Sequence, residues 1–118
     1  MGIEEDIGAM AVDIDQWLDK KAPIAYQNSD TAQDWQRISK ITEEAGEVVR
    51  AFMNLTGANP RRGQSGTLED VTDEMADVAL TAVLAIQHFT KDWSATEGIL
   101  WNRLVEVWQR MPDRYRTE

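Results

Sequence analysis

Hydrophobic side chains recur along this chain at spacings of three and four residues, which is the period of an amphipathic α-helix. The first such stretch runs from Ile3 to Lys21, and Pro23 ends it because proline disfavours helical geometry in the residue before it. The second opens at Asp30, which can cap a helix, and runs to Gly57. No segment alternates apolar and polar positions as a half-buried strand does.

N-terminal capping patterns mark the starts of two more helices. Thr67, followed by acids in the first turn, opens a third helix that extends to about Thr90. Ser94-Ala95-Thr96-Glu97 has the form of a capping box and opens a fourth helix, which Pro112 ends. The tail from Asp113 is expected to be frayed. The sequence therefore predicts an all-α fold with four helices, in a single domain spanning residues 1–118.

The third and fourth helices carry more apolar surface than a lone four-helix bundle can bury. From Val78 to Ile86 the third helix is apolar around most of its circumference, which is typical of a helix buried on all sides. On the fourth helix the apolar stripe is wider than one packing seam and includes Leu100, Trp101, Leu104, Val105 and Trp108. This surplus predicts a homodimer or homotetramer in which another chain covers these faces.

Acidic residues lie beside the apolar stripes of the second and third helices. Glu44 and Glu47 are three residues apart, as are Glu74 and Asp77, so each pair lies on one face of its helix. Like charges at this spacing destabilise a helix by roughly 0.2–0.5 kcal/mol per pair, whereas a divalent cation turns the repulsion into attraction. The pattern is open to two interpretations, a shared Mg²⁺ site and a solvated acidic face. The adjoining apolar residues are expected to face the core, and these are Ile41, Ala45, Val48, Met75, Val78 and Ala82.

Gly46 interrupts the second helix between the acids, at a cost of about 1 kcal/mol relative to alanine. Either close packing of another helix or room for a metal or phosphate explains a glycine at this position. Several residues are candidates for binding the rest of a phosphorylated ligand, although each also suits a surface or packing role. The cations are Lys40, Arg61, Arg62 and Arg103; Trp35 can stack on a base, and Asn54 and Asn102 can read base edges.

The composition narrows the classes of function. A formal net charge of −9 opposes binding to nucleic acid or to anionic membranes. The absence of cysteine removes disulfides and thiolate chemistry, and the single His88 excludes a multi-histidine metal centre, so His88 is expected to be structural. The N-terminal residues lack a signal-peptide pattern, and the longest apolar run is too short to span a bilayer. A cytoplasmic protein is therefore expected.

The pattern Glu43-Glu44-x-x-Glu47, followed on the next helix by Glu74-x-x-Asp77, resembles the MazG-like branch of the all-α nucleoside triphosphate pyrophosphatases. That family also includes dimeric dUTPases and phosphoribosyl-ATP pyrophosphatases. The similarity covers roughly residues 35–86 and includes Lys40 and the Asn-Pro-Arg-Arg-Gly loop. It implies a four-helix MazG-like bundle, assembled as a dimer or tetramer with sites completed between subunits.

The resemblance also implies an activity, the hydrolysis of a nucleoside triphosphate to a monophosphate and pyrophosphate. Mg²⁺ would be the cofactor, with Mn²⁺ able to substitute, and the role would be nucleotide-pool house-cleaning. Glu44, Glu47, Glu74 and Asp77 would be the metal ligands, and Glu43 would support them or activate water. Substrate-binding residues would be Lys40, Trp35, Arg61, Arg62, Asn102 and Arg103. The alternatives are a non-catalytic nucleotide-binding regulatory module and a purely structural helical adaptor.

Overall fold

Four α-helices and one short 3₁₀ helix make up the part of the chain that the structure describes, which is residues 3–22, 30–61 and 63–117 of a computed structural model. The α-helices are α1 (Ile3–Lys21), α3 (Asp30–Thr56), α4 (Leu68–Thr90) and α5 (Trp93–Arg110), and the 3₁₀ helix is η1 (Asp113–Tyr115). The described ranges contain no strand, so the all-α prediction with four helices is confirmed. The expected stop at Pro23 lies outside the described residues.

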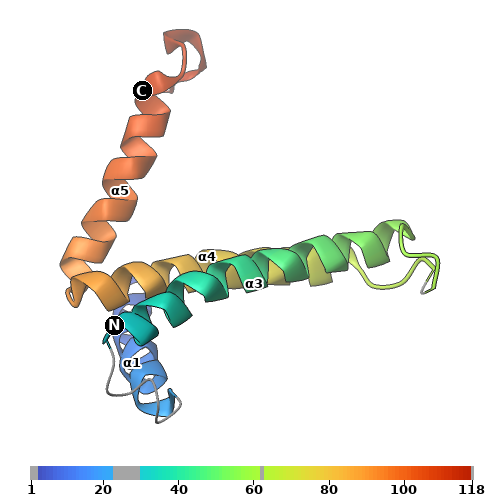
Figure 1. Ribbon diagram of the computed structural model, residues 1–118. Helices are drawn as coiled ribbons and strands as arrows, with labels where there is room; N and C mark the ends of the chain where they lie inside the picture. The colour runs from blue at the N-terminus through green and yellow to red at the C-terminus, as the bar shows by residue number, and fades with distance from the viewer. Residues whose placement is uncertain (1–2, 23–29, 62, 118) are drawn as a thin grey trace.

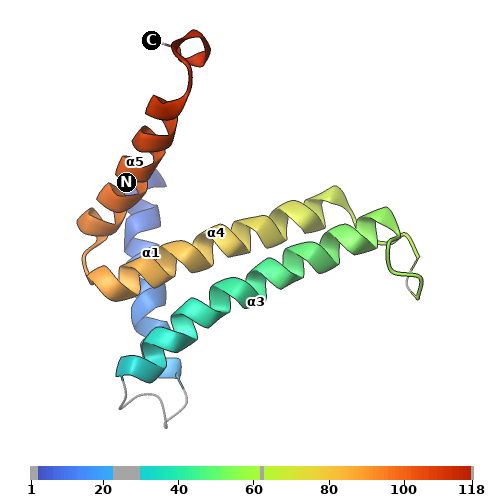
Figure 2. The same cartoon turned by 45° about the horizontal axis from the view of Figure 1, so that its top comes forward.

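The two longest helices, α3 and α4, lie side by side as an antiparallel pair, joined by the loop at one end (Figures 1 and 2). Gly57 ends α3 with a positive φ of 76°, and the next amide, of Ala58, donates to the carbonyl of Met53 at 3.0 Å. At the start of α4, the Asp70 amide donates to Thr67 Oγ1 at 3.2 Å, and the Thr67 amide donates to Asp70 Oδ2 at 2.8 Å. This reciprocal capping box confirms the predicted start of the third helix.

Helix α1 crosses the α3–α4 pair near the end at which α5 begins (Figure 2). At Gly8 it passes close to the first residue of α5, where an added Cβ would lie 2.6 Å from Nε1 of Trp93. Only a glycine lets the helix pass so close to the indole ring. Beyond this point Ala11 and Ala22 are buried, at 4% exposure each. Small residues therefore allow α1 to pack closely where it crosses.

A buried polar network sets the turn between α4 and α5. Lys91 adopts the left-handed conformation, with a φ of 57°, and its amide donates to the carbonyl of Gln87 at 2.9 Å. Thr96, which is fully buried, donates from its hydroxyl to Gln87 Oε1 at 2.8 Å. Asp92 caps α5 by accepting from the amide of Ser94 at 3.0 Å, so the predicted start at Ser94 is wrong by two residues. Asp92 and Ser94 both suit the N-cap position of a helix, so the local sequence did not distinguish between them.

Beyond this turn α5 projects away from the other helices (Figure 1). It ends at Arg110, before Pro112 as predicted. The tail was expected to be frayed, but residues 113–115 form η1. Arg116 stabilises this end of the chain because its guanidinium donates to the carbonyls of Gln109 and Met111, at 2.9 and 2.8 Å.

The four helices do not close into a compact bundle within one chain. The radius of gyration is 17.7 Å, against about 13.5 Å for a compact domain of this length. The accessible surface is 8894 Å², against about 6500 Å² for a folded monomer of this mass. The expectation that α4 is buried on all sides therefore fails for the single chain, in which Leu80 is 46% exposed. Of the positions expected to face the core, Ala45 and Met75 are exposed, and the other four are half-buried.

No helix in the described ranges is long and apolar enough to cross a membrane.

Candidate metal site

Three carboxylates from two helices converge on the α3–α4 pair. Glu44 of α3 and Glu74 and Asp77 of α4 each offer an oxygen, and these three oxygens lie within 4.8 Å of one another. The antiparallel pairing of the helices brings the two motifs to the same level, although they are about thirty residues apart in sequence. Glu44 and Glu74 are partly buried and Asp77 is exposed, so the acidic cluster is open to solvent on one side. Separations of this size suit a single divalent cation bound between oxygen ligands.

A lysine lies at the edge of this acidic cluster. Lys40 Nζ is 3.1 Å from Glu43 Oε1 and 3.4 Å from Glu44 Oε1. The hydrogen bond to Glu43 and the charges of both glutamates raise the pKa of Lys40 above its ordinary value, so its ammonium group stays charged. Glu43 therefore pairs with Lys40 and is not one of the three convergent carboxylates.

The acidic cluster carries unrelieved repulsion. Partial burial, together with the negative charges of Asp77, Glu47 and Glu44, raises the pKa of Glu74. Asp73 adds a further negative charge. A bound metal ion would compensate these negative charges and so remove the repulsion that raises the pKa of Glu74. The donor set therefore fits a metal ion.

Glu47 lies one turn further along α3, where its side chain pairs with Arg50 at 3.0 Å. Both it and Glu74 line a hollow of about 290 Å³ that reaches toward the loop. Other residues in this hollow include Asp73 and Asn54.

Asp73 was not predicted as a site residue from the sequence, although its spacing of four residues from Asp77 places both on one face of α4. Asn54, considered only for reading base edges, has a buried Oδ1 with no hydrogen-bond partner in the described residues.

The other predicted substrate residues are distributed around the molecule. Trp35 is 66% exposed and lines a shallow hollow on α3 beside Gln36 and Ser39. Arg61 is exposed in the loop, and Arg62 lies outside the described residues. Asn102 and Arg103 lie on α5, which projects away from the acidic cluster of its own chain, and Arg103 pairs with Glu106 at 2.9 Å.

Gly46 faces open space, because an added Cβ would meet nothing within 4 Å in the described part of the chain. Close helix packing within the chain therefore does not explain this glycine. Its exposed position also gives no sign that it makes room for a ligand at the acidic cluster.

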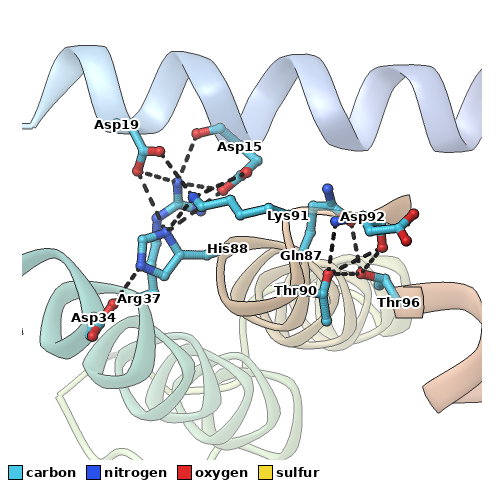
Figure 3. A network of polar contacts seen from close by, with 10 residues as sticks. All are labelled: Asp15, Asp19, Asp34, Arg37, Gln87, His88, Thr90, Lys91, Asp92 and Thr96. Atoms are coloured by element: carbon cyan, nitrogen blue, oxygen red, sulfur yellow. Dashed lines mark hydrogen bonds and ion pairs between the residues drawn. The ribbon is translucent and has the colours of Figure 1, made fainter. Parts of the chain in front are cut away.

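A second group of possible ligands lies where α1 crosses, and Figure 3 shows its contacts. Asp15 and Asp19 of α1 and His88 of α4 offer three atoms within 4.8 Å of one another. Arg37 Nη2, however, lies 2.9 Å from Asp15 Oδ1 and 3.1 Å from Asp19 Oδ1. Lys91 Nζ is 3.4 Å from Asp19 Oδ2. Arg37 and Lys91 therefore compensate the charges of the two carboxylates. We call Asp15, Asp19, Arg37, His88 and Lys91 the crossing network.

His88 lies buried within the crossing network. The His88 ring is 6% exposed, and its Nε2 lies 2.8 Å from Asp34 Oδ1 of α3. The sequence analysis missed its acidic partners on α1, Asp15 and Asp19, although their four-residue spacing places them on one helical face. Their partners on α3 and α4 are remote in sequence, so only the fold reveals the contact.

An antiparallel helical pair with convergent carboxylates and an adjacent lysine has the features of a phosphoryl-transfer site built on α-helices. The model of the phosphoribosyl-ATP pyrophosphohydrolase family matches residues 11–103, which is most of the chain. The chain therefore belongs to this family, a relative of the MazG-like all-α pyrophosphatases, and the resemblance noted in the sequence is confirmed. Comparisons with curated proteins and with solved structures gave no match.

Membership in this family makes the protein a hydrolase of the pyrophosphohydrolase type, with a nucleotide-like substrate. The family is typically metal-dependent, and the acidic cluster is able to bind a metal ion.

Proposed function

We propose that the protein hydrolyses a nucleoside triphosphate between its α and β phosphates, releasing a nucleoside monophosphate and pyrophosphate, with Mg²⁺ as the cofactor. The observation that carries the proposal is the convergence of Glu44, Glu74 and Asp77 within 4.8 Å, with Glu47 one turn away. In this cluster the carboxylates outnumber the cations paired with them, whereas Asp15 and Asp19 of the crossing network have two cations beside them, Arg37 and Lys91. Mn²⁺ fits the same oxygen ligands and is expected to substitute.

The residues of the chain have separate roles in this reaction. Glu44, Glu74 and Asp77 would hold the metal, and Glu47, which pairs with Arg50 one turn away, would be a further ligand. A bound metal would supply charge stabilisation at the phosphate oxygens and lower the pKa of the attacking water. Lys40 presents a charged ammonium group to a phosphate, and Arg61 of the loop is a candidate for the outer phosphates. The contact of Glu43 with Lys40 favours an orienting role for Glu43 over the activation of water.

The direct test is to identify the products by phosphorus NMR during hydrolysis of canonical and modified nucleoside triphosphates with Mg²⁺. Monophosphate and pyrophosphate are expected, and chelation of the metal should stop their release. A diphosphate with orthophosphate would contradict cleavage between the α and β phosphates. Nucleotide binding without any product would indicate the non-catalytic regulatory module instead.

We further propose that a second copy of the chain covers the exposed apolar faces, in a homodimer or homotetramer. The surface of the single chain exceeds that of a folded monomer of the same mass by about 2400 Å². A standard interface buries only about 800 Å² per partner, so the excess is typical of an obligate oligomer. The apolar stripe on α5 adds a groove lined by Trp101, Leu104, Val105 and Trp108. In such an assembly we propose that Asn102 and Arg103 contribute to the site of a neighbouring subunit, as the family resemblance implies.

The test of this assembly is light scattering at micromolar concentration, combined with melting curves over a hundredfold range of protein concentration. The melting temperature should rise with concentration because association stabilises only the folded chain. Leu104→Glu, on the exposed stripe of α5, should shift the population toward a destabilised monomer. A stable monomer of 13.4 kDa in the parent protein would contradict the proposal.

A further inference from the structure

Two hollows lie on either side of the acidic cluster along α3. The smaller, of about 290 Å³, reaches toward the loop and was described with Glu47. The larger, of about 440 Å³, lies between the end of α1 and the first half of α3. Leu18 and Lys21 form part of its α1 wall, and Gln36, Ser39, Lys40 and Glu43 line the α3 side. We call it the α1–α3 hollow.

Lys40 joins the α1–α3 hollow to the acidic cluster. Its side chain lines the hollow, and its ammonium group is 3.4 Å from Glu44 Oε1, one of the three convergent oxygens. A phosphate held by the metal and by Lys40 would therefore have the hollow directly beside it. The part of the ligand attached to that phosphate could then occupy the hollow.

The two hollows differ in the chemistry of their linings. Carboxylates dominate the smaller hollow, which contains Glu47, Asp70, Asp73 and Glu74. Such a lining suits cations and phosphates bridged by them. The α1–α3 hollow has one carboxylate, Glu43, and combines two apolar side chains, of Leu18 and Ala22, with an amide, a hydroxyl, two lysines and one arginine. Small-molecule sites are typically concave, largely apolar spaces of about 300–1000 Å³ with a few polar groups, which describes the α1–α3 hollow and not the smaller one.

The crossing network holds in place the part of α1 that forms one wall of the α1–α3 hollow. Arg37 lines the α1–α3 hollow and also pairs with Asp15 and Asp19 of α1 (Figure 3). Arg37 and Asp15 are both buried, at 7% and 3% exposure, so this contact is shielded from solvent. The end of α1 is thereby held at a set distance from α3. A preorganised wall of this kind reduces the ordering cost of binding a ligand.

We propose that the α1–α3 hollow binds the nucleoside portion of the substrate, with Gln36 and Ser39 as the residues that determine which base is accepted. This inference rests on the proposed hydrolysis of nucleoside triphosphates and adds the place of the nucleoside. The Gln36 amide both donates and accepts hydrogen bonds, so it can pair with a base edge. The Ser39 hydroxyl now donates to the carbonyl of Gln36 at 3.2 Å and can turn toward a ligand.

The experiment fills the hollow by Ser39→Trp and compares it with Thr42→Trp, an exposed position one turn further along the same helix. Binding of a non-hydrolysable nucleoside triphosphate analogue with Mg²⁺ is measured by calorimetry, and binding of inorganic tripolyphosphate with Mg²⁺ is measured in parallel. Ser39→Trp should weaken nucleotide binding by about tenfold or more and leave tripolyphosphate binding unchanged. Thr42→Trp should change neither, and circular dichroism should show both variants folded.

A second variant, Gln36→Ala, tests the assignment of specificity. Ratios of kcat/KM between purine and pyrimidine triphosphates should change by roughly tenfold, because a site that pairs with a base edge discriminates by its polar contacts. Unchanged ratios would remove Gln36 from the assignment and overturn this part of the inference.

The outcomes separate the inference from the function on which it rests. If the parent protein neither binds nor hydrolyses any nucleotide, the proposed function and the inference both fail. If it does bind or hydrolyse nucleotides but Ser39→Trp behaves as Thr42→Trp does, only the inference fails. Loss of tripolyphosphate binding in Ser39→Trp would mean a disturbed phosphate site and would also overturn it. The inference is likewise overturned if Ala51→Trp, in the smaller hollow, blocks the nucleotide instead.

Discussion

Two clusters of carboxylates lie in different parts of the molecule, one between α3 and α4 and the other where α1 crosses that pair, and they differ in their neighbours. In the acidic cluster, Glu44, Glu74 and Asp77 converge with Lys40 at one edge. In the crossing network, Asp15 and Asp19 converge with His88, but Arg37 and Lys91 lie among them. Both offer three atoms within 4.8 Å of one another, so distance alone does not separate them.

The difference lies in charge compensation. In the crossing network the buried carboxylate of Asp15 has a cation beside it, Arg37, and a buried carboxylate is stable only when its charge is paired. The acidic cluster is open to solvent and keeps an excess of negative charge that raises the pKa of Glu74. The first arrangement therefore stabilises the fold, and the second is available for a cation. The comparison predicts that mutations in the two clusters act on different properties.

The largest effect is expected from Asp77→Asn in the acidic cluster. Turnover should fall by at least roughly 10²-fold, because even loss of a residue that supports a metal ligand costs 10–100-fold. The free energy of unfolding of the metal-free protein should stay the same or rise, since one repulsive charge is removed. The measurements are steady-state kinetics and urea denaturation. Glu69→Gln, an exposed acid near the start of the same helix, is the matched control. Full activity of Asp77→Asn would remove the acidic cluster from the reaction.

The second effect is expected from Asp15→Asn in the crossing network. It removes the carboxylate closest to Arg37 in a buried site. A buried charge left unpaired costs about 3–5 kcal/mol of unfolding free energy, and the loss here should be smaller because Asp19 remains 3.1 Å from Arg37. The specific activity of the folded fraction at saturating nucleotide should be largely retained, because neither Asp15 nor Arg37 belongs to the acidic cluster. Asp13→Asn, an exposed acid on the same helix, should cost little. If Asp15→Asn unfolds no more easily than Asp13→Asn, the crossing network does not hold α1 in place.

A smaller effect is expected from the metal itself. Mg²⁺ or Mn²⁺ at about ten times its dissociation constant should add about 1.4 kcal/mol to the free energy of unfolding, because it binds only the folded chain. The rise in melting temperature should disappear in Asp77→Asn and persist in the control Glu69→Gln. A thermal shift that instead depends on Asp19 would move the metal to the crossing network and reverse the comparison.

The smallest effect concerns pH. The pKa of Glu74 is raised in the folded protein above 4.5, its ordinary value, so the folded state binds the proton more tightly than the unfolded state does. The contribution of Glu74 therefore makes the metal-free protein less stable as the pH rises from about 4.5 through the folded pKa. Unfolding curves across this range should show a shallower decline in Glu74→Gln than in the parent. An identical decline in both would mean that Glu74 feels no repulsion from its neighbours.

Local chemistry was enough to predict the helices from the sequence. The three- and four-residue periodicity located α1 and α3, and capping patterns located α4 and α5. The capping box at Thr67 gave the start of α4 because it depends only on residues within one turn. The start of α5 was misplaced by two residues because Asp92 and Ser94 are both capable caps, and the turn after Lys91 selects between them. The acids of the motif were also readable, since three-residue spacing on a helix fixes a shared face.

Only the tertiary structure decided which groups meet. It placed Glu44 beside Glu74 and Asp77, paired Asp15 and Asp19 with Arg37, and put Gln36 and Ser39 in a hollow next to Lys40. The physical reason is that helix crossing and antiparallel packing join segments whose separation in sequence carries no local signal. Periodicity states which face of a helix is apolar, but not which helix covers it. The direction of α5 shows this limit, because its apolar stripe was predicted while its projection away from the chain was not.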